Sequence, residues 1–230
     1  PGWRLDASAR ARHRALIVAQ LDLYNGALLL CGERFLASTA ENVQARRLLD
    51  HVWGNGGVKA CLEEGQWAFA MRAQMLDYDP SIEPDWGLRR AFTKGDDWVL
   101  TSAVCSDEFF KQPLLNYSDE VLTIFADIDV IYVKFVSNDA SYGMNIAKWP
   151  ESFRELVEAH FAWKIVKTLT GSQDDEERLE KLRGKRLSDA MNRSAMAGPT
   201  KFPAQGGWTR SRMGSGRSTR DGGSDHTLIG

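Results

Sequence analysis

Residues 21–53 read LDLYNGALLLCGERFLASTAENVQARRLLDHVW, and this stretch predicts two helices joined by a short turn. At its start, apolar residues recur at spacings of four, three and four, which places them on one helix face: Ile17, Leu21, Tyr24 and Leu28. Gly32 suits the left-handed backbone conformation that ends many helices. The first helix is therefore expected from near Ser8 to Leu30. Gly26 inside it indicates either close approach by a neighbouring element or simple tolerance.

The second half of the stretch predicts another helix. Ser38 and Glu41 have the capping-box spacing, in which the Ser38 hydroxyl accepts a hydrogen bond from the Glu41 amide and the Glu41 carboxylate reaches back. The next apolar stripe consists of Ala45, Leu48, Leu49 and Val52. This helix should end at Trp53, before the glycine-rich turn at residues 54–57. The result is a helical hairpin with one core-facing side and no catalytic chemistry.

Three further helices are expected. A helix is expected over residues 58–75, where Cys61, Leu62 and the run of residues 67–71 are apolar almost all round, which favours a central position. Pro150 is placed to open a helix that keeps its period to about Thr170. A charged helix should follow over residues 174–196, and its thin apolar stripe predicts weak packing or contact with a partner.

The middle of the chain predicts strands. Residues 98–104 have the composition of a strand. Residues 121–125 and 130–136 are rich in β-branched and aromatic side chains and predict an antiparallel hairpin around Asp127–Asp129.

These elements predict a mainly α protein: a helical bundle with a small inserted antiparallel β region and an extended C-terminal arm. We expect four parts: a helical core over residues 1–75 and 149–197, an irregular and β-containing insertion over 76–148, and an extended tail over 198–230.

Length and composition indicate a globular protein with a sizeable core. Residues 1–14 and residues 198–230 each carry a net charge of +3, which leaves −8 for the middle of a chain whose total is −2. Basic ends on an acidic body indicate contact with an anionic partner, or simply solvated tails.

The three cysteines are far apart and form no CxxC motif, which predicts buried free thiols in a reducing compartment: Cys31, Cys61 and Cys105. No apolar run approaches the ~20 residues of a membrane span, so we expect a soluble intracellular protein without membrane contact.

The acidic residues near residue 80 and His160 are the polar candidates for a metal-binding or catalytic role. The densest carboxylate group (Asp77, Asp79, Glu83 and Asp85) could bind a divalent cation, but its spacing does not match an EF-hand and favours turn formation. His160 lies on an apolar helix face and is expected to be a hydrogen-bonded core residue rather than a ligand or base. No catalytic residue, metal site or cofactor is predicted.

The basic ends supply the candidate binding residues. In the glycine-rich tail these are Trp208, Arg210, Arg212, Arg217 and Arg220, and near the N-terminus they are Arg4, Arg10, Arg12 and Arg14. The tail could follow phosphates electrostatically or dock as an extended segment on a neighbouring subunit, with Trp208 as an anchor.

Several spaced blocks of residues resemble the phage tail tubular protein A family, the head-to-tail adaptors of short-tailed phages. The strongest is CLEEGQWAFA at residues 61–70. The others are YNGAL at 24–28, GER at 32–34, Ser38 and Glu41, RRLLD at 46–50, Trp53, Tyr78-Asp79, Gly87, Ala91-Phe92, Asp97-Trp98 and Trp149-Pro150. The similarity covers roughly residues 15–165. Where the family commonly has a proline before the Asp-Trp pair and an arginine shortly after it, this chain has Gly95-Asp96 and Leu100.

This resemblance implies a non-enzymatic virion protein at the head–tail junction, assembled in the host cytoplasm. It implies a ring, most often of twelve copies, between the portal protein and the tail nozzle or tail tube, with genomic DNA passing non-specifically through the lumen. It also implies that the C-terminal arm docks on the portal. Two rival hypotheses are a soluble nucleic-acid-binding module that uses its basic ends, and a metal-dependent hydrolase that uses the acids of residues 77–85.

Overall fold

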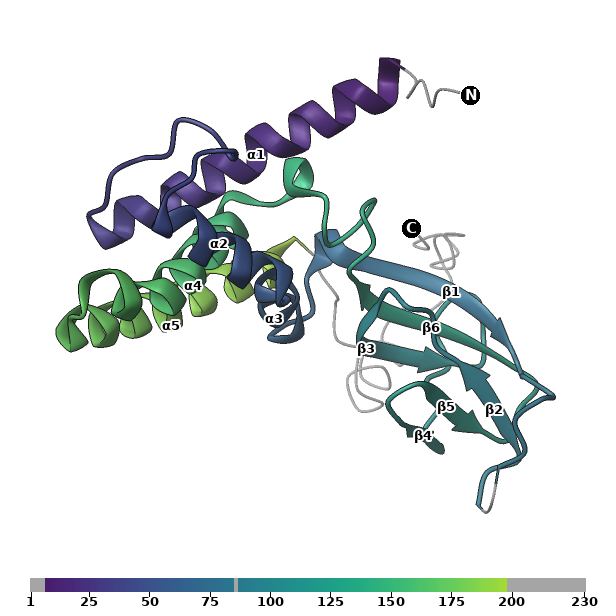
Figure 1. Ribbon diagram of the computed structural model, residues 1–230. Coiled ribbons are helices and arrows are strands. Elements are labelled where there is room, and N and C mark those ends of the chain that lie inside the picture. The colour runs from purple at the N-terminus through teal and green to yellow at the C-terminus, as the bar shows by residue number, and fades with distance from the viewer. Residues whose placement is uncertain (1–6, 85–86, 198–230) are drawn as a thin grey trace, which may run out of the picture. The chain divides into compact units, whose positions relative to one another are not determined.

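The computed structural model describes residues 7–84 and 87–197, with side chains described from residue 17 onward. The helices of this part of the chain are α1 (Ala7–Cys31), α2 (Gln44–Gly54), α3 (Gly57–Glu63), α4 (Glu151–Thr170) and α5 (Gln173–Met196), with short 3-10 helices η1 (Ala68–Ala70) and η2 (Ile146–Lys148). The strands are β1 (Met71–Asp77), β2 (Arg90–Thr93), β3 (Trp98–Cys105), β4 (Tyr117–Asp119), β5 (Thr123–Ala126) and β6 (Val130–Ser137). Figure 1 shows their arrangement.

The expectation of a mainly α bundle with a small β insertion is wrong. Helices make up 46% and strands 20%, and the strands form two three-stranded antiparallel sheets, so the fold is an α/β mixture. The sheets have the orders β1-β6-β3 and β2-β5-β4. The β part has a hydrophobic core of its own, which includes Phe92, Ile124, Ile131, Val133 and Phe135.

The predicted helix over residues 58–75 is wrong beyond Glu63. The Trp67 indole N–H donates to the carbonyls of Cys61 and Leu62 at 3.1 and 3.2 Å. Those two carbonyls are the acceptors that the next helical turn would need, so the side chain of Trp67 ends α3. The chain then makes η1 and enters β1, which pairs with β6 from Met71–Val136 to Asp77–Val130.

The strand predicted at residues 98–104 is confirmed as β3, but the predicted hairpin is wrong. β5 pairs with β2 and β4, whereas β6 pairs with β1 and β3, so the two strands lie in different sheets. The residues between them bind a distant segment instead of closing a hairpin turn. Asp127 accepts a hydrogen bond from the Arg89 amide at 3.1 Å, and Asp129 accepts one from the Arg90 side chain at 2.7 Å.

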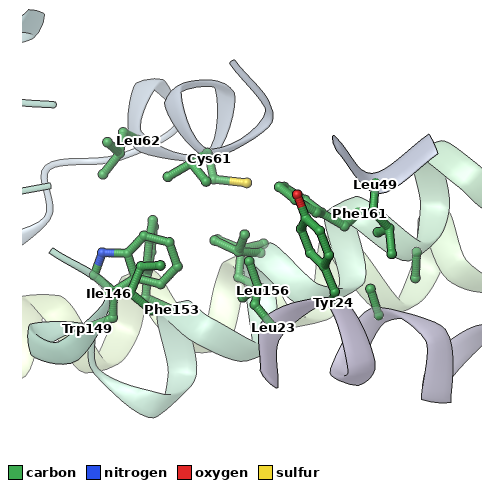
Figure 2. Packing of buried hydrophobic residues seen from close by; sticks show 14 of the residues in the cluster. Leu23, Tyr24, Leu49, Cys61, Leu62, Ile146, Trp149, Phe153, Leu156 and Phe161 are labelled. Carbon is green, nitrogen blue, oxygen red and sulfur yellow. The ribbon is translucent and has the colours of Figure 1, made fainter. Parts of the chain in front are cut away.

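α4 is the centre of the helical part, because α1, α2, α3 and α5 all pack on it (Figure 1). The buried apolar residues of α4 lie on several sides of the helix, which is typical of a helix covered all round: Phe153, Leu156, Val157, Phe161, Ile165 and Val166. Figure 2 shows Tyr24 and Leu23 of α1, Leu49 of α2 and Cys61 of α3 meeting these side chains.

The predicted limits of α1 are confirmed, and Gly32 follows the helix with a positive φ of 74°. The predicted capping box is wrong. α2 starts at Gln44 with Val43 as its N-cap residue, and Ser38 forms a turn in the preceding loop. The Glu41 carboxylate accepts from Arg34 and from the Ala37 amide, so it closes this loop rather than a helix end.

The predicted helices at the C-terminal side are confirmed, with Pro150 directly before α4 and Ser172 as the N-cap of α5. The Ser172 hydroxyl accepts from the Asp175 amide at 3.2 Å. The expectation that α5 packs weakly is wrong, because it lies along α4 and buries Leu179 and Ala190 completely. Within the described residues, no helix is long and apolar enough to cross a membrane.

Candidate interaction surfaces

The predicted partner-binding residues fall mostly outside the described part of the chain. This holds for the five candidates of the C-terminal tail (Trp208, Arg210, Arg212, Arg217 and Arg220) and for Arg4. Arg10, Arg12 and Arg14 lie on the first turns of α1, where the backbone alone is described. Residues 7–16 are helical, so these three arginines belong to one continuous helix.

The acidic residues near residue 80 form a turn. Asp79 accepts hydrogen bonds from the amide and hydroxyl of Ser81 at 2.9 and 2.6 Å, and from the Thr93 hydroxyl at 3.1 Å. These bonds favour the charged carboxylate and lower the pKa of Asp79. No group of three or more potential metal ligands occurs among the described residues; Asp85 lies outside them. The arrangement fits the turn interpretation of this group.

The three cysteines are free thiols. Cys61 and Cys105 are buried, whereas Cys31 is half-buried. Burial raises the pKa of Cys61 to about 12 and that of Cys31 to about 11. Thiols that hold their protons this strongly are poor nucleophiles, so a structural role is favoured for both.

His160 lies in a polar network that joins α3, α4 and α5. The Arg183 Nε donates to the His160 Nδ1 at 3.0 Å, and the same guanidinium pairs with Glu64. Burial lowers the pKa of His160 to about 4, which keeps the ring neutral near pH 7. The prediction of a hydrogen-bonded core histidine is confirmed.

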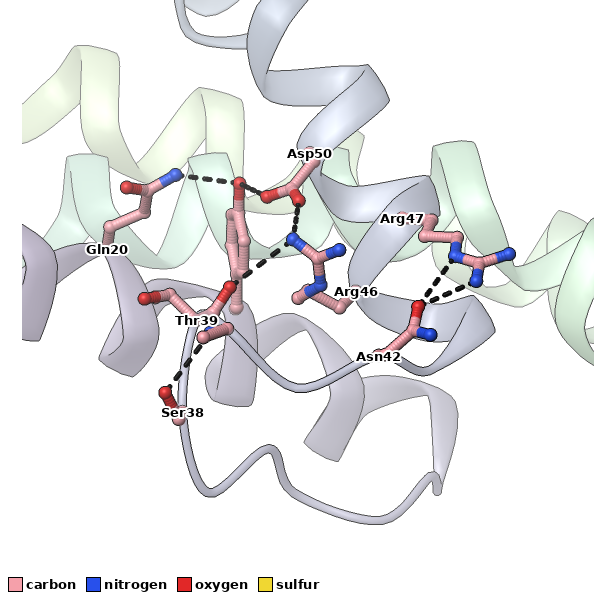
Figure 3. Close-up of polar contacts among 9 residues, drawn as sticks. Gln20, Ser38, Thr39, Asn42, Arg46, Arg47 and Asp50 are labelled. Atoms are coloured by element: carbon pink, nitrogen blue, oxygen red, sulfur yellow. Dashed lines mark hydrogen bonds and ion pairs between the residues drawn. The ribbon is translucent and has the colours of Figure 1, made fainter.

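A second network fixes α2 against α1 (Figure 3). The fully buried Tyr24 accepts from Gln20 at 2.8 Å and donates to Asp50 at 3.0 Å. Asp50 also accepts from Arg46 at 2.6 Å, and Arg46 donates to the Thr39 carbonyl at 3.3 Å. Burial raises the pKa of the Tyr24 hydroxyl, so it acts as a hydrogen-bonded core group.

Gly26 of α1 leaves room for the half-buried carboxyl group of Glu158 on α4. A Cβ atom at residue 26 would lie 2.3 Å from the Glu158 Cδ, so a larger residue here would require the Glu158 carboxyl group to move. Burial raises the pKa of Glu158 to about 7. The neighbouring charges act in both directions, with Arg154 and Arg186 lowering the pKa and Glu151 and Glu155 raising it.

The raised pKa of Glu158 predicts that the free energy of unfolding depends on pH. The folded protein holds the Glu158 proton more tightly than the unfolded chain, so the stabilisation is complete below the ordinary value of 4.5. We expect it to be lost as the pH rises through about 7. Urea unfolding across this window should show a falling free energy of unfolding. The Glu158→Gln variant should lack that component, and an unchanged pH profile in the variant would contradict the assignment.

Among the apolar features on the surface of the described chain, two are candidate interaction surfaces. The first is the β4–β5 tip, defined as Glu120, Val121 and Leu122 in the loop between these strands; Val121 is 90% and Leu122 71% exposed. The second is the α5 groove, a hollow of about 240 Å³ between η1, the start of α4 and the end of α5. The groove is lined by Trp67, Ala68, Phe69, Pro150, Glu151, Ser152, Phe153, Ala190, Arg193, Ser194 and Ala197.

The sequence contained a signal for the tip but none for the groove. Val121 and Leu122 stand where a turn normally has polar residues. Because they begin a run with the composition of a strand, they were assigned to that strand instead of to a turn. The groove combines residues from three distant segments, so no local pattern could show it.

Comparison with known proteins adds no relative: no protein-family model matches the chain, and no curated protein matches it.

Proposed function

We propose that this protein is a non-enzymatic structural protein of a virion: a head-to-tail adaptor whose copies form a ring between the portal and the tail. In this proposal the genome passes through the lumen of the ring. The protein is assembled in the host cytoplasm and ends at the head–tail junction of the particle.

The observation that carries the proposal is that the sequence blocks that resemble the adaptor family meet in space. Trp67 and Trp149 come from different blocks, and both pack on Phe153, with ring centroids 4.8 and 5.1 Å apart. Tyr24, Arg46 and Asp50 also come from two blocks and form one hydrogen-bonded network. These blocks therefore build the aromatic core and one polar network of the helical part, which is the scaffold that the proposal requires.

The surfaces of the molecule also suit assembly. A closed ring of identical subunits requires two different surfaces on each subunit, one for each neighbour. We take the β4–β5 tip and the α5 groove as candidates for these two surfaces. Residues 198–230 supply the proposed portal contact, and Arg10, Arg12 and Arg14 the proposed contact with DNA or a partner.

The portal contact gives a direct test. We expect the full-length variant with Trp208→Ala, Arg210→Ala and Arg212→Ala to bind purified portal rings about 30-fold more weakly or worse, because truncating a central anchor costs about 2 kcal/mol or more. Binding is measured by sedimentation with portal rings of the same virus. The Lys59→Ala variant, which changes an exposed residue of α3, serves as the control and should bind normally. Equal binding by the triple variant would remove the docking role.

A further inference from the structure

The β4–β5 tip is held in one shape although its side chains face solvent. The Glu120 amide donates to the Thr123 carbonyl at 2.9 Å, and the Lys94 amide donates to the Leu122 carbonyl at 2.9 Å. The Lys94 ammonium group also contacts the Glu120 carbonyl and the Asp119 carboxylate. These bonds fix the backbone on both sides of Val121, so little ordering entropy remains to be lost when a partner binds.

Such a loop exposes apolar surface without any visible benefit to the isolated chain. Val121 and Leu122 are adjacent, and neither packs into the core of its own sheet. A preorganised pair of adjacent exposed aliphatic side chains is a candidate for one half of an interface.

The α5 groove has the properties of the other half. Its lining is largely apolar and includes Pro150 and three aromatic residues, Trp67, Phe69 and Phe153, of which Trp67 and Phe153 are each 1% exposed. A cavity of about 150 Å³ holds a benzene ring, so a groove of about 240 Å³ has room for a leucine side chain with a valine beside it. The exposed Arg193 on the groove offers a positive partner to the exposed Glu120 next to the apolar pair, while Glu151 also lines the groove.

We infer that the β4–β5 tip of one copy inserts into the α5 groove of the next copy. Leu122 and Val121 fill the groove, and Glu120 pairs with Arg193. The contact joins two different surfaces, so repeating it adds copies in one direction and closes a ring when the rotation allows. This inference rests on the proposed function, because it names the subunit contact of the adaptor ring.

Disulfide trapping between two full-length variants tests the contact. Leu122→Cys is mixed with Ala197→Cys, a substitution at an exposed end of the groove, under mild oxidation. We expect a mixed disulfide dimer at least tenfold above the homodimer yield of either variant. The matched control replaces Leu122→Cys by Met75→Cys, which lies on exposed β1 outside the tip. A mixed yield no higher than that of this control, or disulfides confined to homodimers, would overturn the inference.

Two blocking variants separate this inference from the proposed function. Leu122→Asp puts a charge on the tip, and Ala197→Trp fills the groove. Each full-length variant alone should therefore fail to build rings on the portal. Mixed together, each retains one intact surface, and they should form a 1:1 heterodimer and nothing larger. If both variants still form normal rings on portal, the tip–groove contact is wrong and the adaptor proposal stands. If mixed disulfides form but the unmodified chain never binds portal, the adaptor proposal fails and the contact is a self-association surface.

Discussion

We expect the Trp67→Ala variant to lose about 3–5 kcal/mol of unfolding free energy, the cost of removing a fully buried large aromatic side chain. Trp67 is 1% exposed and packs edge-on against Phe153 with ring centroids 4.8 Å apart. Its loss also leaves the carbonyls of Cys61 and Leu62 without the indole donor that ends α3. Urea unfolding followed by circular dichroism measures the change.

Two controls separate packing from the hydrogen bonds of Trp67. The Trp67→Phe variant keeps an aromatic ring and loses the N–H, so it should be destabilised less than Trp67→Ala. The Leu115→Ala variant truncates an apolar side chain that is 91% exposed and should change the free energy by less than about 0.5 kcal/mol. If Trp67→Ala were no less stable than Leu115→Ala, the core built around α3 and α4 would be incorrect.

The second large effect is expected at Arg183, which joins α5 to α3 and α4. The Arg183→Met variant leaves the Glu64 carboxylate and the His160 Nδ1 without their partner. Breaking a fully buried ion pair costs about 3–5 kcal/mol. The side chains of Arg183 and Glu64 are 19% and 26% exposed, so solvent reduces the expected loss to about 2–3 kcal/mol.

A double variant provides the control for this pair. Arg183→Met combined with Glu64→Leu removes both charges together, so much of the lost stability should return. Thermal and urea unfolding of the two single variants and the double variant give the coupling energy. Additive losses would show that Glu64 and Arg183 do not act as a pair.

The helices were largely predictable because their signals are local. Gly32 follows the end of α1 with a positive φ, and Pro150 directly precedes α4. Two of the failures have non-local causes. Residues 67–71 form a continuous apolar run that fits a helix as well as a strand, and the bonds from Trp67 to α3 decide between the two.

Strand pairing was the other failure, and the cause is again distance along the chain. β5 and β6 are adjacent in sequence and rich in strand-forming residues, which favours a hairpin. Asp127 and Asp129 instead bind Arg89 and Arg90, so the chain passes from one sheet to the other between these strands. A pattern within a single strand carries no information about this choice of partner.

The candidate interaction surfaces likewise divide into those that the sequence predicted and those that it did not. The sequence pointed to the basic ends, which lie almost entirely outside the described residues. It did not point to the α5 groove, because Trp67, Phe153 and Ala190 are brought together only by the packing of α5 on α4. The basic ends could be anticipated from composition alone. The α5 groove could not, because three segments that are far apart in the sequence form it.

Electron microscopy of the full-length protein, alone and mixed with portal rings of the same virus, tests the central claim most directly. The adaptor proposal predicts an additional ring of density, coaxial with the portal and built from copies of this chain around an open lumen. A protein that stays monomeric and leaves the portal rings bare would contradict it.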